Sequence, residues 1–125
     1  MVRKIILDTN FLLIPSQFNV DIFTEINRIV LEKHQLFVLD KTIDELKKLS
    51  VNPKQSLKNR RAAKLGLQLL KAKKVKVLKT KVDESVDDIL ASIKGYTIAT
   101  QDIGLKRRIK GKKIVLRAKK KLIFA

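Results

Sequence analysis

Short apolar runs alternate along the chain with longer stretches in which apolar residues recur at helical spacing. The apolar runs predict strands over residues 5–7, 36–39, 75–78, 96–100 and 113–116, with a further short strand over 122–124. The helical spacing predicts helices over residues 20–33, 42–49, 59–73, 84–94 and 104–110. Strands that alternate with helices indicate an α/β fold, here a three-layer α/β/α sandwich around a central, mainly parallel sheet.

Acidic residues lie where this pattern changes from strand to helix. Asp8 directly follows the first apolar run, and Asp102 closely follows the run over residues 96–100. The other acids at such breaks are Asp44, Glu45, Asp83, Glu84, Asp87 and Asp88. Because the strand-to-helix turns of a parallel sheet open on one edge, these carboxylates are expected to gather there. Carboxylate oxygens bind hard divalent cations, so the pattern predicts Mg²⁺ or Mn²⁺ as the cofactor.

Each of these acids also has a purely structural interpretation. Glu45 follows Thr42 by three residues, which is the spacing of a capping box at a helix start. Asp102 precedes a predicted helix and could cap it. Asp8 could simply cap a turn. Asp83 and Glu84 could lie at a helix N-terminus, where negative charge is favoured. Several carboxylates buried together without a cation would be costly, however, and this favours a shared metal site.

The net charge indicates the kind of partner. The chain has 29 Lys and Arg residues against 12 Asp and Glu residues, a formal charge of +17. Such an excess repels itself and needs an anionic partner. Nucleic acid is the expected partner, with an anionic membrane surface as the main rival. A basic protein that gathers its few carboxylates in one pocket is suited to metal-dependent cutting of a polyanion.

Length and composition narrow the class of protein further. A chain of 125 residues is long enough for one domain with a real core. The apolar runs are shorter than the ~20 residues of a membrane span, and the one near the start is too short for a signal peptide. Cysteine is absent, so neither disulfides nor thiolate metal sites are available. We therefore expect a soluble, cytoplasmic protein without a membrane partner.

The basic residues concentrate in two parts of the chain. Residues 103–125 contain ten Lys and Arg residues and no acid, and a second cluster lies near residue 60. Basic side chains hold phosphates without reading bases. With five Phe and one Tyr, stacking platforms are sparse, so backbone contacts are expected to dominate. The candidate RNA-binding residues are Lys58, Arg60, Arg61, Lys106, Arg107, Arg108, Lys110 and Arg117.

Three segments together resemble a known family. Residues 5–12 (Ile-Ile-Leu-Asp-Thr-Asn-Phe-Leu) resemble the opening of PIN-domain nucleases, and residues 43–49 (Ile-Asp-Glu-Leu-Lys-Lys-Leu) resemble their second acidic segment. Residues 96–102 (Tyr-Thr-Ile-Ala-Thr-Gln-Asp) resemble their last acidic strand. The continuation over residues 105–110 resembles the archaeal and eukaryotic branch that processes small-subunit pre-ribosomal RNA. The resemblance covers nearly the whole chain and implies a PIN-like domain over residues 1–125.

This resemblance implies a catalytic site as well as a fold. It implies that Asp8, Glu45, Asp83 and Asp102 bind one or two Mg²⁺ or Mn²⁺ ions and catalyse cleavage of single-stranded RNA. Thr9, Asn10 and Thr100 are candidates to orient these carboxylates or a metal-bound water. Ordinary turn chemistry is the alternative role for those three residues.

The third acid is open among four candidates. Asp83, Glu84, Asp87 and Asp88 all lie near the start of the helix before the last acidic strand. A helix from Asp83 or Glu84 would span about 16 Å, close to the roughly 17 Å of a five-residue strand, whereas one from Asp88 would span only about 10 Å. The length and the ungapped resemblance favour Asp83. Asp87, one turn further along the same face, could join it or hold a water.

These features predict a divalent-metal-dependent endoribonuclease in pre-ribosomal RNA processing. The expected partners are pre-ribosomal RNA, ribosome-assembly proteins and a second copy of the chain. One alternative keeps the fold and makes the protein a VapC-type toxin that cuts one RNA. The other is a catalytically weak RNA-binding scaffold in ribosome assembly, which would not need Asp8.

Overall fold

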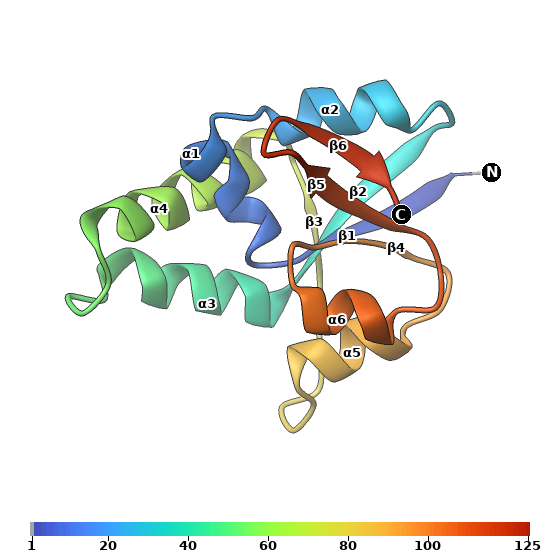
Figure 1. The fold of residues 1–125 in the computed structure, drawn as a ribbon. Coiled ribbons are helices and arrows are strands. Elements are labelled where there is room, and N and C mark those ends of the chain that lie inside the picture. Colours follow the sequence, from blue (N-terminus) through green and yellow to red (C-terminus); the bar gives the residue numbers. More distant parts are fainter. Residues whose placement is uncertain (1) are drawn as a thin grey trace.

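The computed structural model describes residues 2–125 and contains one sheet of six strands (Figure 1). The strands are β1 (Arg3–Leu7), β2 (His34–Leu39), β3 (Lys76–Leu78), β4 (Thr97–Ala99), β5 (Lys113–Arg117) and β6 (Lys121–Phe124). Their order is β3-β2-β1-β4-β5-β6. The first five strands are parallel, and β6 returns antiparallel to β5. The predicted mainly parallel α/β fold is therefore confirmed.

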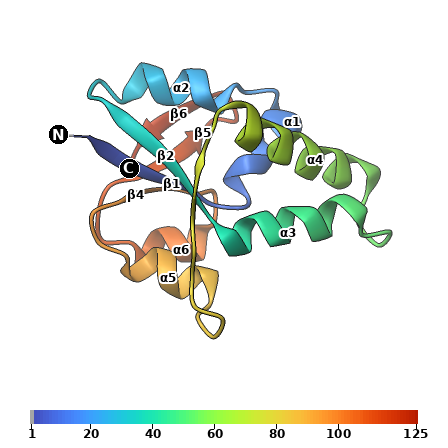
Figure 2. The same ribbon diagram turned by 180° about the vertical axis from the view of Figure 1, so that it is seen from behind.

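Helices cover both faces of the sheet (Figure 1). They are the 3₁₀ helix η1 (Phe11–Leu13) and the α-helices α1 (Ile14–Phe18), α2 (Ile22–Ile29), α3 (Asp40–Val51), α4 (Leu57–Ala72), α5 (Val86–Ser92) and α6 (Ile103–Arg108). Helices α1, α2 and α4 lie over one face, and α5 and α6 lie over the other. Helices α3 and α4 form a hairpin that projects beyond the sheet (Figures 1 and 2). No helix within residues 2–125 is long and apolar enough to cross a membrane.

The strands are apolar on both sides because both faces of the sheet are covered. Successive residues of β1 point to opposite faces, so Ile5 and Leu7 join the larger core while Ile6 joins the smaller one. In the larger core, Gly66 of α4 lies against η1, and a Cβ there would come within 3.0 Å of the backbone oxygen of Leu12. This close approach holds η1, which directly follows the end of β1, against α4.

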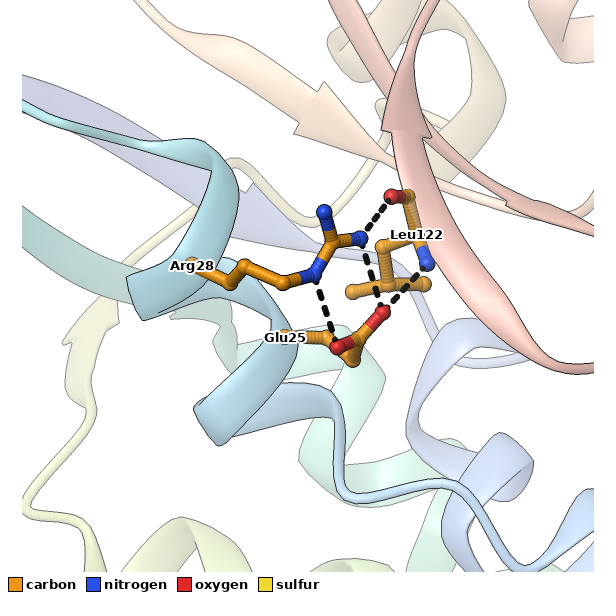
Figure 3. Close-up of polar contacts among 3 residues, drawn as sticks. All are labelled: Glu25, Arg28 and Leu122. Atoms are coloured by element: carbon orange, nitrogen blue, oxygen red, sulfur yellow. Dashed lines mark hydrogen bonds and ion pairs between the residues drawn. The ribbon is translucent and has the colours of Figure 1, made fainter.

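Side chains of α2 fasten the edge strand β6 to the rest of the fold (Figure 3). Glu25 accepts a hydrogen bond from the backbone N–H of Leu122 at 3.0 Å, and Arg28 donates to the Leu122 carbonyl at 2.9 Å. Arg28 also donates two bonds to the Glu25 carboxylate, each 3.0 Å long. The pair thus satisfies backbone groups of Leu122 that an unprotected sheet edge would leave open to another chain.

Two local predictions were wrong. The apolar pattern predicted no helix before residue 20, but the short helix α1 begins at Ile14. Pro15 is tolerated near its start because the first helical N–H groups have no intrahelical partner. The helix predicted over residues 84–94 is shorter and runs over Val86–Ser92. Ser85 caps it by accepting from the backbone N–H of Asp88 at 3.1 Å, so Asp83 and Glu84 lie before the helix.

Candidate functional site

An acidic cleft of about 270 Å³ lies at the carboxyl ends of the parallel strands. Its lining consists of Asp8, Thr9, Asn10, Leu13, Glu45, Leu49, Val86, Asp87 and Asp102. These residues come from the end of β1, from η1, from α3 and α5, and from the start of α6. The strand order reverses between β1 and β4, and this switch point is where α/β sheets bind ligands. The structure therefore brings Asp8, Glu45 and Asp102 together, as the sequence pattern predicted.

Asp8 is the most buried acid of the cleft, with 5% of its surface exposed. Its Oδ1 accepts from the backbone N–H of Thr9 at 2.8 Å, and its Oδ2 accepts from the hydroxyl of Thr100 at 2.7 Å. Burial raises the pKa of the Asp8 carboxyl above its ordinary value of 3.8, and the nearby charges of Asp87 and Glu45 raise it further. The two hydrogen bonds act in the opposite direction without cancelling this effect. The carboxylate thus lies where a cation would stabilise it.

Thr100 links Asp8 to Asp102. The Thr100 hydroxyl donates to Asp8, and its oxygen accepts from the backbone N–H of Asp102 at 3.1 Å. Asp102 is also the N-cap of α6, because its Oδ1 accepts from the backbone N–H of Leu105 at 3.0 Å. The capping interpretation of Asp102 is therefore confirmed, yet the same side chain lines the cleft. A carboxylate has acceptor capacity beyond one hydrogen bond, so capping leaves Asp102 able to bind a cation.

Asn10 and Gln101 fasten the end of β1 to the segment after β4. The Asn10 side-chain oxygen accepts from the backbone N–H of Gln101 at 3.0 Å. The Gln101 side chain donates in turn to the Asn10 carbonyl at 2.8 Å. Gln101 was not among the predicted site residues, and its position between Thr100 and Asp102 was the signal that could have revealed it. These contacts hold the two buried strand ends in register at the cleft.

Glu45 enters the cleft from the second turn of α3. The helix begins at Asp40 with Leu39 at the N-cap position, so Thr42 lies inside it. The capping-box interpretation of Glu45 is therefore wrong. Glu45 instead shares a helix face with Leu49, four residues further on, and both line the cleft.

Among the four candidates for the third acid, Asp87 lies in the cleft. Asp83 falls in the turn before α5 and is not part of the cleft lining. Asp88 faces away and forms an ion pair with Arg108 of α6 at 2.7 Å. The preference for Asp83 depended on a longer helix, and the later start of α5 removes that argument. Glu84 also precedes the helix and does not line the cleft.

The donor set of the cleft is compatible with a hard cation. All its charged groups are carboxylates, and the buried Thr9 hydroxyl oxygen has no hydrogen-bond partner. Within residues 2–125, no group of three His, Asp or Glu side chains is close enough to ligate one ion directly. Mg²⁺ usually keeps several waters and takes only one or two carboxylates directly. An ion bound partly through water therefore fits this arrangement better than a fully dehydrated one.

The predicted RNA-binding residues lie on α4, on and just after α6, and at the end of β5. Lys58 and Arg61 are exposed on α4, in the projecting hairpin, and Arg107 and Lys110 are exposed at the end of α6 and just after it. Arg108 is engaged by Asp88. The remaining candidates are the partly buried Arg60 and Lys106 and the exposed Arg117 at the end of β5.

Comparison with protein families identifies the fold. The model of a family described as "PIN like domain" matches residues 5–119. The chain belongs to the PIN-like domain family. The solved structure of the PIN domain endonuclease Utp24 superimposes with a TM-score of 0.73 at 23% identity, covering 97% of this chain and 90% of that one. At this identity the likeness shows the PIN fold. A search of curated proteins finds no match.

Proposed function

We propose that this PIN-like protein is a divalent-metal-dependent endoribonuclease that cuts single-stranded RNA during pre-ribosomal RNA processing. The observation that carries the proposal is Asp8, a buried carboxylate that shares a cleft with three other acids at the switch point of the sheet. Asp8, Glu45, Asp87 and Asp102 are the proposed acids that hold Mg²⁺ or Mn²⁺, one or two of them directly and the others through water. Asp87 takes the place that the sequence had given to Asp83.

The side chains of the cleft have distinct proposed roles. A bound cation would supply an activated water and would stabilise negative charge on the phosphate. Thr100 and the backbone of Thr9 hold the Asp8 carboxylate through its two oxygens. Asn10 and Gln101 keep the Asp8 strand beside the Asp102 turn. Leu13, Leu49 and Val86 contribute apolar surface to the lining of the cleft.

The charge of the chain supports RNA as the substrate. The formal charge of +17 and the exposed cations on α4 and α6 would allow contacts to the phosphate backbone. The role in small-subunit pre-ribosomal RNA processing rests on the resemblance of residues 105–110 to that branch and on the likeness to the PIN domain endonuclease Utp24. The proposed partners are therefore pre-ribosomal RNA and ribosome-assembly proteins.

The test compares Asp8→Asn, Asp87→Asn and Asp83→Asn in Mn²⁺-dependent cleavage of single-stranded RNA. The first two variants are expected to lose at least about 100-fold in rate, because several kcal/mol of charge stabilisation come from the cation. Asp83→Asn removes the same charge four residues before Asp87, at a position that does not line the cleft. It serves as the matched control, with near-normal cleavage expected. RNA binding should stay close to that of the unmodified protein in all three.

The same experiment separates the proposed enzyme from an RNA-binding scaffold. Full cleavage by Asp8→Asn would contradict the assigned site, and unmodified protein that binds RNA without cutting it in Mn²⁺ would favour the scaffold. If Asp83→Asn lost as much activity as Asp87→Asn, the third acid would have to be reassigned.

A further inference from the structure

The acid that α5 contributes to the cleft depends on a weakly anchored part of the fold. Helix α5 has seven residues, of which Leu90 is buried, and it follows a segment over residues 79–85 that has no regular structure. Figure 2 shows this segment descending from β3 past the start of α3 before it turns into α5. The ion pair between Asp88 and Arg108 is exposed to solvent and therefore contributes little to holding α5 in place. Val86 at the start of α5 packs against the smaller core, and polar contacts from α3 hold the segment that precedes it.

Asp40 forms hydrogen bonds to the beginning of the segment over residues 79–85. It is the first residue of α3, and its Oδ1 accepts from the Thr80 hydroxyl at 2.6 Å and from the backbone N–H of Lys41 at 2.8 Å. Its Oδ2 accepts from the backbone N–H of Thr80 at 3.2 Å. The Asp40 carboxylate therefore joins residues that lie 40 positions apart in the sequence.

Lys41 forms hydrogen bonds to the end of the same segment. Its ammonium group donates to the backbone carbonyls of Lys81 and Glu84. Glu84 immediately precedes Ser85, the N-cap of α5, so the contact lies within three residues of Asp87. Lys41 also precedes Glu45 by four residues and therefore lies on the same face of α3. One helix thus carries a cleft acid and the contacts that hold the segment bearing another.

We propose that Asp40 and Lys41 form a latch that positions Asp87 in the cleft and so sets the affinity of the site for its cation. The latch rests on the proposed function, because it acts through a proposed metal ligand. Neither residue lines the cleft, so both are positioning residues. By reciprocity, cation binding tightens the latch and protects residues 79–85 from opening.

The decisive variant is Lys41→Met, because the latch and simple electrostatics predict opposite results. Removing a positive charge near a carboxylate site should by itself strengthen cation binding. Loss of the latch should instead weaken it by about 10-fold or more, as for other changes that misplace metal ligands. Mn²⁺ affinity is measured by titration calorimetry on the full chain. Lys48→Met, an exposed lysine three residues beyond Glu45 on the same helix, is the matched control and should not weaken binding.

A double-mutant cycle with Asp87→Asn tests whether the effect passes through Asp87. If it does, Lys41→Met and Asp40→Asn weaken Mn²⁺ binding in the unmodified protein but cause no further loss once Asp87 is replaced. Lys41→Arg retains N–H donors at this position and should bind Mn²⁺ nearly normally. Normal binding by this variant would show that the loss in Lys41→Met does not come from a general loss of the fold. Hydrogen exchange should show that Mn²⁺ protects residues 79–85 in the unmodified protein and less so in Lys41→Met.

The outcomes separate the latch from the proposed function. Unchanged or tighter Mn²⁺ binding by Lys41→Met would overturn the latch while leaving the metal site intact. An equal loss in the Asp87→Asn background would also overturn it, because the effect would not pass through Asp87. If the unmodified protein does not bind Mn²⁺, or if Asp8→Asn binds it equally well, the proposed function itself fails.

Discussion

At the scale of single residues, the cleft is built around a carboxylate that the fold alone does not stabilise. Asp8 is nearly inaccessible to solvent, and its pKa is raised chiefly by burial. Thr100 and Thr9 supply its two hydrogen bonds. A group whose folded-state pKa is raised favours the folded state when protonated, so its charge lowers stability at neutral pH. This is the expected cost of a preorganised cation site.

We predict that Asp8→Asn raises the melting temperature in EDTA at pH 7. The amide oxygen can still accept from Thr9, and the amide nitrogen can donate to Thr100, so the buried charge is removed while the hydrogen bonds remain. A gain of about 1 kcal/mol corresponds to roughly 4 °C in a domain of this size. Differential scanning calorimetry measures the shift. Mn²⁺ should then raise the melting temperature of the unmodified protein but not of the variant, and a variant that melts lower in EDTA would contradict the prediction.

At the scale of elements, an ion pair of α2 adds to the attachment of β6, which also pairs with β5. Glu25 and Arg28 bond to each other and to the backbone of Leu122 (Figure 3). The bond from Arg28 is the main reason that the pKa of Glu25 lies below its ordinary value of 4.5, and the Leu122 N–H adds to the effect. A carboxyl whose folded-state pKa is lowered stabilises the fold above its unfolded pKa, and this stabilisation is lost as pH falls through the folded value.

We predict that Glu25→Gln lowers the urea midpoint more at pH 7 than at acidic pH. Glutamine can still accept from Leu122, so the loss is that of the charge on a partly exposed pair, about 0.5–1 kcal/mol. The difference should narrow as the pH falls through the lowered pKa of the Glu25 carboxyl, because Glu25 itself is then protonated. Asp44→Asn, which removes an exposed acid of α3, is the control and should leave the midpoint unchanged. An equal loss for Glu25→Gln at both pH values would show that the charge does not matter.

At the scale of the whole molecule, the few acids and many bases are separated in space. The cleft gathers four of the 12 acidic residues, while exposed cations lie on the α3–α4 hairpin and around the end of α6. Such a distribution attracts a polyanion and still leaves a site of negative potential for a cation. The scarcity of aromatic residues indicates binding through the phosphate backbone rather than through base stacking.

We predict that Arg107→Ala combined with Lys110→Ala weakens binding to all single-stranded RNA sequences alike. Each lost phosphate contact lowers the slope of log affinity against log salt by about 0.7, so two contacts lower it by about 1.4. Fluorescence anisotropy over a series of salt concentrations measures both quantities. Lys71→Ala combined with Lys76→Ala removes the same charge from exposed positions near the opposite edge of the sheet and should change the slope less. A sequence-selective loss would instead indicate base readout.

The sequence by itself determined the kind and order of the main elements and the placement of Asp8 and Asp102 directly after strands. These features depend on local burial patterns and chain direction, which periodicity records. Helix α1 escaped prediction because Pro15 is compatible both with a loop and with a helix start. Helix α3 begins at Asp40, so Thr42 and Glu45 lie inside the helix and do not form a capping box.

Only the tertiary structure decided which acid of residues 83–88 enters the cleft and which side chains hold the site together. The bond from Thr100 to Asp8 joins residues 92 positions apart, the bond from Gln101 to Asn10 spans 91, and the Thr80–Asp40 bond spans 40. Such pairs leave no periodic trace in the chain, because each depends on where two separate elements end in space. Asp87 and Asp88 differ by one residue, yet a helical rotation of about 100° sends one into the cleft and the other to Arg108.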